Sequence, residues 1–322
     1  MTADFDFEQS INEFEQRIKE LEEVSASSKV DLSKEISAIA SKLDQIKTEI
    51  YGNLKPWQVV KVSRHINRPS TLDYIQLLCG NEFVELHGDR LYSDDPAIVA
   101  GFGQIGEHRL AIIGHQKGHD TEDNIFRNFG MPHPEGYRKA MRIMKMAEKF
   151  NLPIVTFIDT PGAFPGVGAE ERGQSNAIAE SLALMSSLRV PILCFVTGEG
   201  GSGGALALSV GDRIFMFEFS TYSVISPEGC ASILWKDAKK QREAAEALKI
   251  EAKDLLKLGI IDDILPEPIG GAHRNHEETA QEIKKKIDSC LPILKKISAD
   301  DLIKSRYEKF RRIGVFSVNE EF

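Results

Sequence analysis

Two glycine-rich segments, each placed between an apolar run and a helical stretch, constrain the fold of this chain most. The first, residues 159–166, reads Asp-Thr-Pro-Gly-Ala-Phe-Pro-Gly and follows the apolar run 152–158. The second, residues 198–204, has five glycines in seven positions and follows the apolar run 190–196. Apolar runs that alternate with helices are typical of parallel strands joined by helical crossovers. The pattern therefore predicts an α/β fold.

The flanking sequence extends this alternation. A helix is expected over 134–150, where Pro134 suits the first turn, and a β-hairpin over 98–115. The strand units recur at roughly 25 to 40 residues, which fits either an open doubly wound sheet or a stacked superhelix. Further expected elements are helices at 71–79, about 169–188, about 203–210 and from 227, and strands at 213–219 and 222–225.

The two ends of the chain are expected to be helical. Apolar residues step by three and four from Phe7 to Ile50, with a polar break at 25–28, which predicts a helical hairpin. This arm, residues 1–53, could pack on its own body or dock on another subunit, and both readings stay open. The main domain is expected over 54–322. Its last part, from His276, is helical, with an apolar docking stripe at Ile283, Ile287, Leu291 and Leu294.

Composition excludes several classes of protein. The 322 residues carry 40 basic and 49 acidic side chains, a net charge of −9, which argues against a nucleic-acid-binding surface. No apolar run approaches the roughly 18 residues of a membrane span, and the acidic start is unlike a secretory signal. The four cysteines are widely scattered, which argues against a disulfide framework or a zinc ribbon on this chain. We therefore expect a soluble cytoplasmic protein.

The glycine segments are also the best candidates for chemistry. Glycines that open a helix leave backbone N–H groups unpaired and unshielded, and such groups bind phosphate or stabilise a developing oxyanion. Gly203 and Gly204 would supply such donors, and the turn at 162–164 would supply an opposing one. Because ligands bind at the carboxyl ends of parallel strands, both segments should face one crevice. A purely packing role for the glycines is the alternative.

Two nucleotide-binding interpretations compete with this one. Residues 198–203 match G-x-G-x-x-G, with Glu218 near the position of a ribose-binding acid, but the match lies deep in the chain and Glu218 falls within an apolar strand. Residues 159–162 resemble the D-x-x-G of GTP-binding proteins. The sequence has no G-x-x-x-x-G-K-[ST] run, so the GTP-binding interpretation is excluded.

With these segments in view, the chain resembles the family of carboxyltransferase alpha subunits of acetyl-CoA carboxylase, of the bacterial and plastid multi-subunit type. The resemblance covers nearly the whole chain and is densest over 57–275. Beyond the two glycine segments, the motifs that carry it lie at 64–65, 68–74, 114–118, 127–132, 168–174, 222–230 and 270–275.

The resemblance implies a crotonase-type ββα superhelix with an N-terminal helical arm and C-terminal helices. It implies transfer of the carboxyl group from carboxybiotin, on a biotin carboxyl carrier protein, to acetyl-CoA, which gives malonyl-CoA for fatty-acid synthesis. The active site would lie between alpha and beta subunits in an α2β2 assembly, with CoA and a zinc ribbon on the beta subunit and no metal on this chain. An acyl-CoA hydratase or isomerase, a dinucleotide-dependent oxidoreductase and a non-catalytic scaffold are the alternatives.

The resemblance also assigns roles to residues of this sequence. Gly203 and Gly204 would hold the ureido oxygen of biotin through their backbone N–H groups. The loop around them would be shaped by Gly200 and Gly201, and its second wall formed by Gly162, Ala163 and Phe164. Apart from the resemblance, three side chains in a polar stretch after a strand, His115, Lys117 and Arg127, could receive the phosphates of CoA or could only solvate a loop.

Overall fold

One twisted sheet organises the main body of the protein. The computed structural model describes residues 6–28 and 31–315. Within them the sheet has eight strands in the order β1-β2-β3-β4-β5-β6-β8, with β7 beside β5. The strands are β1 (Val84–Glu85), β2 (Ile98–Ile105), β3 (His108–His115), β4 (Ile154–Thr160), β5 (Ile192–Gly201), β6 (Arg213–Phe217), β7 (Thr221–Ser223) and β8 (Asp263–Leu265).

Strand pairing confirms the predicted hairpin and the predicted parallel strands. Strands β1, β2 and β3 pair antiparallel, whereas β3-β4-β5-β6-β8 are parallel. Ile154 pairs with Ile192, and after a shift in register Thr160 pairs with Gly200. The carboxyl ends of β3, β4 and β5 therefore meet at one edge of the sheet, where both glycine segments lie.

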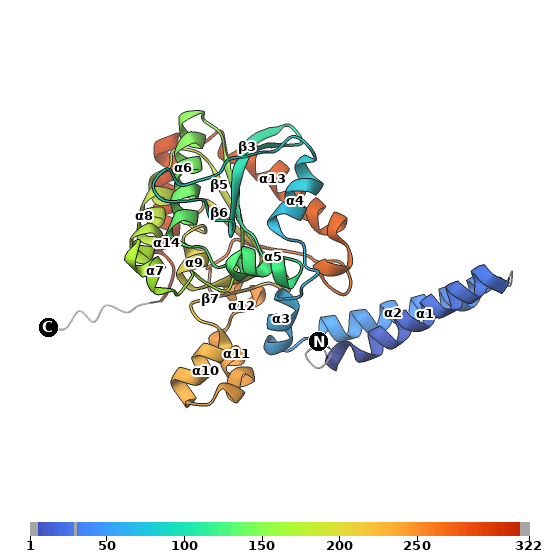
Figure 1. The fold of residues 1–322 in the computed structure, drawn as a ribbon. Coiled ribbons are helices and arrows are strands. Elements are labelled where there is room, and N and C mark those ends of the chain that lie inside the picture. The colour runs from blue at the N-terminus through green and yellow to red at the C-terminus, as the bar shows by residue number, and fades with distance from the viewer. Residues whose placement is uncertain (1–5, 29–30, 316–322) are drawn as a thin grey trace.

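Helices cover both faces of the sheet (Figure 1). On one face lie α6 (Pro134–Lys149), α8 (Gln174–Ser187) and α14 (Ala299–Arg311). On the other lie α4 (Thr71–Cys79) and α13 (His276–Leu294), whose predicted stripe Ile283, Ile287, Leu291 and Leu294 is buried against the strands. Every residue of β4 and β5 is buried, as is typical of parallel strands covered on both faces.

Helix α14 is fixed to the body by a buried arginine. Arg306 is 1 % exposed and donates to both carboxylate oxygens of Asp212, at 2.9 and 2.8 Å. Its remaining N–H groups donate to the carbonyls of Met185, Leu188 and Val190. All five guanidinium donors therefore face acceptors, so burial of this charge is compensated.

The N-terminal arm is a helical hairpin that projects from the body (Figure 1). It consists of α1 (Gln9–Ser28) and α2 (Ser33–Gly52), and its base packs on the body through Ile11, Tyr51 and Phe219. The predicted break at 25–28 is wrong, because these residues continue α1. Ser27 and Ser28 donate to the carbonyl of Val24, a bond that lets serine remain helical.

Two other sequence predictions are corrected. Residues 198–201 extend β5 as strand, and the helix that follows, α9 (Ser202–Leu206), ends at Leu206 rather than near residue 210. The helix expected over 169–188 is divided into α7 (Val167–Glu171) and α8, because Gly173 adopts a left-handed φ of 82°.

The remaining helices connect these layers. A lobe formed by α10 and α11, residues 227–248, projects below the body (Figure 1). The other helices are α3 (Pro56–Ser63), α5 (Thr121–Phe126), α10 (Pro227–Trp235), α11 (Gln241–Leu248), α12 (Ala252–Lys257) and the short 3₁₀ turns η1 (Asp6–Glu8), η2 (Asn128–Gly130), η3 (Ala238–Lys240) and η4 (Ala272–Arg274).

Candidate functional site

The two glycine segments are in direct contact. A Cβ atom placed on Gly204 would lie 2.5 Å from the carbonyl carbon of Gly162 and 2.6 Å from the nitrogen of Ala163. A Cβ on Gly201 would overlap the carbonyl of Pro161. Only glycine allows this approach, so close packing is one real role of Gly201 and Gly204. The structure therefore brings together the two segments that the sequence singled out.

The amides of these segments are not equivalent. Gly203 and Gly204 are the second and third residues of α9, so no carbonyl within that helix can accept from them. On the other side of this contact, in the turn at 162–164, Gly162 N–H donates to Thr160 Oγ1 and Phe164 N–H donates to the Pro132 carbonyl. Of the opposing turn, only the Ala163 N–H has no acceptor among the residues that the structure describes. The arrangement offers donors from both sides of one contact.

The start of α9 is conformationally strained. Ser202 has a φ of 52°, a left-handed conformation that is unfavourable for a residue with a Cβ. Its side chain is exposed, whereas Gly203 is half-buried and Gly204 is buried. Outliers of this kind gather at functional sites, where the surrounding structure maintains them. Here the strain turns the chain from β5 into α9 within one residue.

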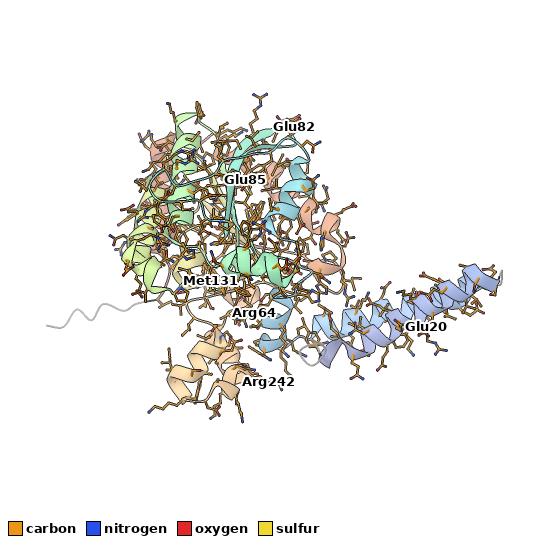
Figure 2. The ribbon with its side chains drawn as sticks, in the orientation of Figure 1. Glu20, Arg64, Glu82, Glu85, Met131 and Arg242 are labelled. Atoms are coloured by element: carbon orange, nitrogen blue, oxygen red, sulfur yellow. The ribbon has the colours of Figure 1, made fainter. Side chains whose placement is uncertain are left out.

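A charged network lies beneath the glycine segments. Lys117 Nζ is 2.6 Å from Asp159 Oδ1, and the same oxygen accepts the N–H of Glu199 at 3.0 Å. Arg64 holds Glu199 at 2.5 Å and Glu228 at 2.6 Å. Figure 2 labels Arg64 between the body and the α10–α11 lobe. The network therefore connects the ends of β4 and β5 to the first turn of α10.

The pKa of Glu228, at the outer end of the network, agrees with its ion pair to Arg64. Burial acts to raise the pKa of Glu228, but hydrogen bonding and charge from Arg64 outweigh it, and the pKa lies below its ordinary value. Glu228 is therefore held as a carboxylate by its partner. The N-terminus of α10 is capped by the hydroxyl of Ser226, which accepts from Gly229 N–H, and not by Glu228.

The three predicted phosphate ligands have different surroundings. His115 has no exposed surface, and burial lowers its pKa to about 4, so its ring is neutral behind the site. Arg127 pairs with Asp123 at 2.7 Å and donates to the Pro96 carbonyl. Lys117 is committed to Asp159 but borders a cavity of about 100 Å³ that also contacts Arg64 and Arg68. Only Lys117 therefore joins the network beneath the glycines.

Sequence reasoning missed the members of this network other than Lys117. Asp159 and Glu199 are 7 % and 9 % exposed, and each lies near the carboxyl end of a buried apolar strand. Carboxylates that interrupt strands buried on both faces need a counterion, and that signal was available in the sequence. The partner Arg64 lies 135 residues from Glu199, a pairing that needs the tertiary fold.

The dinucleotide-binding interpretation does not fit this geometry. A phosphate-binding fingerprint requires its glycines at the turn between strand and helix, whereas Gly198, Gly200 and Gly201 lie in β5. Glu218 follows the end of β6 and is exposed. The glycines that do open a helix are Gly203 and Gly204.

None of the helices seen over 6–28 and 31–315 is both long and apolar enough to span a bilayer. Among the same residues, no three His, Cys, Asp or Glu side chains are grouped so that they could hold a metal ion.

Known proteins resemble this chain over almost its full length. Residues 4–314 match the family model described as acetyl co-enzyme A carboxylase carboxyltransferase-like. The acetyl-coenzyme A carboxylase carboxyl transferase subunit alpha of Halalkalibacterium halodurans is 56% identical over 317 residues, 98% of this chain and 97% of the relative. The same subunit of Geobacter metallireducens is 53% identical over 312 residues, 97% of this chain and 98% of the relative.

Solved structures support the fold. A Pseudomonas malonate decarboxylase hetero-tetramer in complex with coenzyme A superposes with a TM-score of 0.60 at 14% identity, covering 76% of this chain and 98% of that one. Transcarboxylase 12S superposes with a TM-score of 0.56 at 17% identity, covering 82% of this chain and 46% of that one. At these identities the similarity concerns architecture, and it confirms the crotonase-type α/β fold that the resemblance implied.

Proposed function

This chain belongs to the family of acetyl-CoA carboxylase carboxyltransferase alpha subunits, and from that premise we propose that its glycine segments stabilise the negative charge that develops during carboxyl transfer. The reaction is transfer of a carboxyl group from carboxybiotin to acetyl-CoA, which yields malonyl-CoA. Carboxybiotin supplies the carboxyl group when it is bound. The residues of this chain supply binding and electrostatic stabilisation.

The donors proposed for the ureido oxygen of biotin are the N–H groups of Gly203 and Gly204, with Ala163 opposite. The contact between Gly204 and the 162–163 turn is the observation that supports this proposal, because Gly203, Gly204 and Ala163, whose N–H groups have no acceptor among the described residues, belong to the two segments that meet there. Donors fixed before the reaction need no reorganisation when charge develops, which is the source of their catalytic effect. Gly201 lets β5 pack on the carbonyl of Pro161, Gly200 lets it pack on Tyr222, and Phe164 is proposed to border the site.

The surroundings of Gly203 bear on whether biotin can reach its amide. A Cβ on Gly203 would lie 3.5 Å from Ile178, an ordinary van der Waals contact, so a methyl group fits at this position. Gly203 is half-buried, which suits an oxygen that approaches its amide from outside. The charged side chains nearby form ion pairs with each other, as in Lys117 with Asp159 and Arg64 with Glu199, which leaves the main chain as the binding group.

The partners belong to the same proposal. The beta subunit, which would hold CoA and a zinc ribbon, is proposed to complete the site in an α2β2 assembly, and a biotin carboxyl carrier protein to deliver the carboxyl group in the cytoplasm. Exposed apolar side chains at Val224, Ile233 and Leu234 support a partner near the lobe. They lie close in sequence to β7, which pairs with the glycine end of β5.

The decisive experiment removes one N–H group and compares the result with a variant that keeps it. Gly203→Pro deletes the amide hydrogen, whereas Gly203→Ala keeps it and adds a methyl group that fits beside Ile178. After reconstitution with the beta subunit, carboxylation of free biotin from malonyl-CoA should fall by about 10²- to 10³-fold in kcat for the proline variant and only a few fold for the alanine variant.

Assembly measured by size-exclusion chromatography controls for misfolding of either variant. An assembled Gly203→Pro complex with wild-type kcat would contradict the role of the amide. A wild-type complex with no carboxyl transfer, but with turnover of an enoyl-CoA, would favour a hydratase or isomerase instead.

A further inference from the structure

A basic groove of about 530 Å³ runs along the outer side of α6. Its apolar lining includes Met141, Met146 and the highly exposed Leu91. Five of its lining side chains are cationic, namely Arg90, Arg138, Arg142, Lys145 and Lys149. This concentration of positive charge stands out on a chain whose net charge is −9.

Most of these cations have no carboxylate partner. In the described part of the chain, Arg90, Arg142, Lys145 and Lys149 form no ion pair within 4.0 Å. Arg90 and Arg142 instead donate to the same carbonyl, that of His87, at 3.0 and 3.1 Å. Burial and the charge of Arg90 hold the pKa of Arg142 below its ordinary value. Two neighbouring guanidinium groups without a counterion favour the approach of an anion.

The local carboxylates do not neutralise the groove. Asp89 is 6 % exposed, and its Oδ1 accepts three backbone N–H groups of its own loop. Arg138 lies 3.8 Å from Glu135, but that carboxylate is bound more closely by Arg172, at 2.7 Å. Glu180 of α8, the remaining carboxylate of the lining, forms no ion pair within 4.0 Å among the described residues. Asp94, whose charge also acts on Arg142, is bound by Lys139 at 2.6 Å.

An ordinary solvated helix would look different. On α13, lysines are paired within the helix, as in Lys284 with Asp288 at 2.6 Å and Lys285 with Glu282 at 2.5 Å. On α6 the cations recur at 138, 142, 145 and 149, which places them on one helical face. Glu148, which lies between Lys145 and Lys149 in the sequence, instead accepts the backbone N–H of Arg189 at 2.8 Å. The contrast shows that the stripe on α6 is not a repeat of the chain's usual surface pattern.

One end of the groove is linked to the wall of the proposed site by hydrogen bonds. Arg138 donates to the carbonyl of Arg172 at 2.5 Å. Two residues later, Gln174 donates to the carbonyl of Phe164 at 3.0 Å. One end of the basic stripe is therefore joined by two hydrogen bonds to the turn that borders the glycine amides.

We propose that this groove docks an acidic surface of the protein that carries biotin. The inference rests on the proposed function, since a tethered cofactor can reach the glycine amides only if its carrier settles beside them. Methionine and leucine side chains between the cations suit a protein that offers one apolar residue among carboxylates. A long nucleic acid is disfavoured by the negative charge of the rest of the chain.

The test separates the carrier protein from its cofactor. In the reconstituted complex, KM is measured for the biotinylated carrier protein and, separately, for free biotin. Lys145→Glu/Lys149→Glu should raise KM for the carrier by roughly tenfold and leave KM for free biotin unchanged, since two rim charges become repulsive. The control Lys295→Glu/Lys296→Glu changes net charge equally on an exposed turn elsewhere and should alter neither value.

Leu91→Ser provides a second variant with no change of charge, and it too should raise KM only for the carrier. Equal KM values for wild type and both groove variants would overturn the docking proposal while free-biotin activity still upheld the proposed function. Loss of all activity in the wild-type complex would instead reject the proposed function. Binding of a 20-base-pair duplex that is abolished by Lys145→Glu/Lys149→Glu, with unchanged carrier KM, would assign the groove to nucleic acid and overturn the proposal.

Discussion

Asp159 shapes the site through its carboxylate as well as through the turn that it precedes. It holds Lys117 and the backbone of Glu199, so one side chain links β3, β4 and β5 at their carboxyl ends. Its neighbour Gly198 must be glycine, because a Cβ there would lie 2.5 Å from the same carboxylate. Asp159 and Gly198 therefore help to determine where the glycine amides are held, although neither is proposed to donate a hydrogen bond to the reacting groups.

Buried His115 predicts a measurable pH dependence at the residue scale. Burial lowers its pKa to about 4 from 6.5, so the unfolded chain binds the extra proton between these values. Stability is therefore complete above pH 6.5 and is lost as pH falls toward 4. His115→Gln should reduce the slope of unfolding free energy against pH by up to about 1.4 kcal/mol per pH unit in this window, as measured by urea unfolding. An unchanged slope would show that His115 is protonated equally in both states.

At the scale of elements, the hydrophobic pattern predicted most of the sheet and its covering helices. The runs at 152–158 and 190–196 became β4 and β5, and 134–150 became α6, because long apolar periods report burial directly. The ends of elements depended on local contacts that periodicity does not contain. Helix α1 continues through the serines to Ser28, and the left-handed Gly173 divides α7 from α8. The two glycine segments were expected to face one crevice; their direct contact and the ion network beside it were not expected.

Helix α14 should depend on its single buried arginine. Arg306→Met leaves Asp212 buried at 4 % exposure without its counterion, so the free energy of unfolding should fall by about 3–5 kcal/mol. The matched control Arg312→Met removes an exposed pair with Glu308 and should cost less than about 1 kcal/mol. Chemical denaturation of the two variants gives the comparison. Similar losses for both would mean that Asp212 is satisfied without Arg306.

At the scale of the whole molecule, the arm and the body meet over a small apolar junction. Ile11 has no exposed surface there, and Glu15 reinforces the contact through Arg274 at 2.9 Å. The rest of the hairpin extends away from the body (Figure 1). The junction accounts for how the arm is held, while docking of the arm on another subunit stays a prediction.

Detachment of the arm should therefore leave the body folded. Ile11→Asp places a charge in the junction, and limited proteolysis should then cut near residue 53 and leave a resistant body. Val24→Asp, at an exposed position near the far end of α1, is the control and should digest like the wild type. Degradation of the entire Ile11→Asp chain without a resistant fragment would show that arm and body unfold as one unit.

Arg64 links the α10–α11 lobe to the strand that leads to the glycine amides. One guanidinium neutralises a carboxylate on the lobe and another on the strand that leads to the glycine amides. If the lobe moved outward, Glu228 would lose its partner Arg64, whereas Glu199 would keep Arg64 and, at 3.7 Å, Lys117. A subunit that holds the lobe in place would therefore also hold Arg64 between the two carboxylates, so assembly would fix the residue that contacts the end of β5.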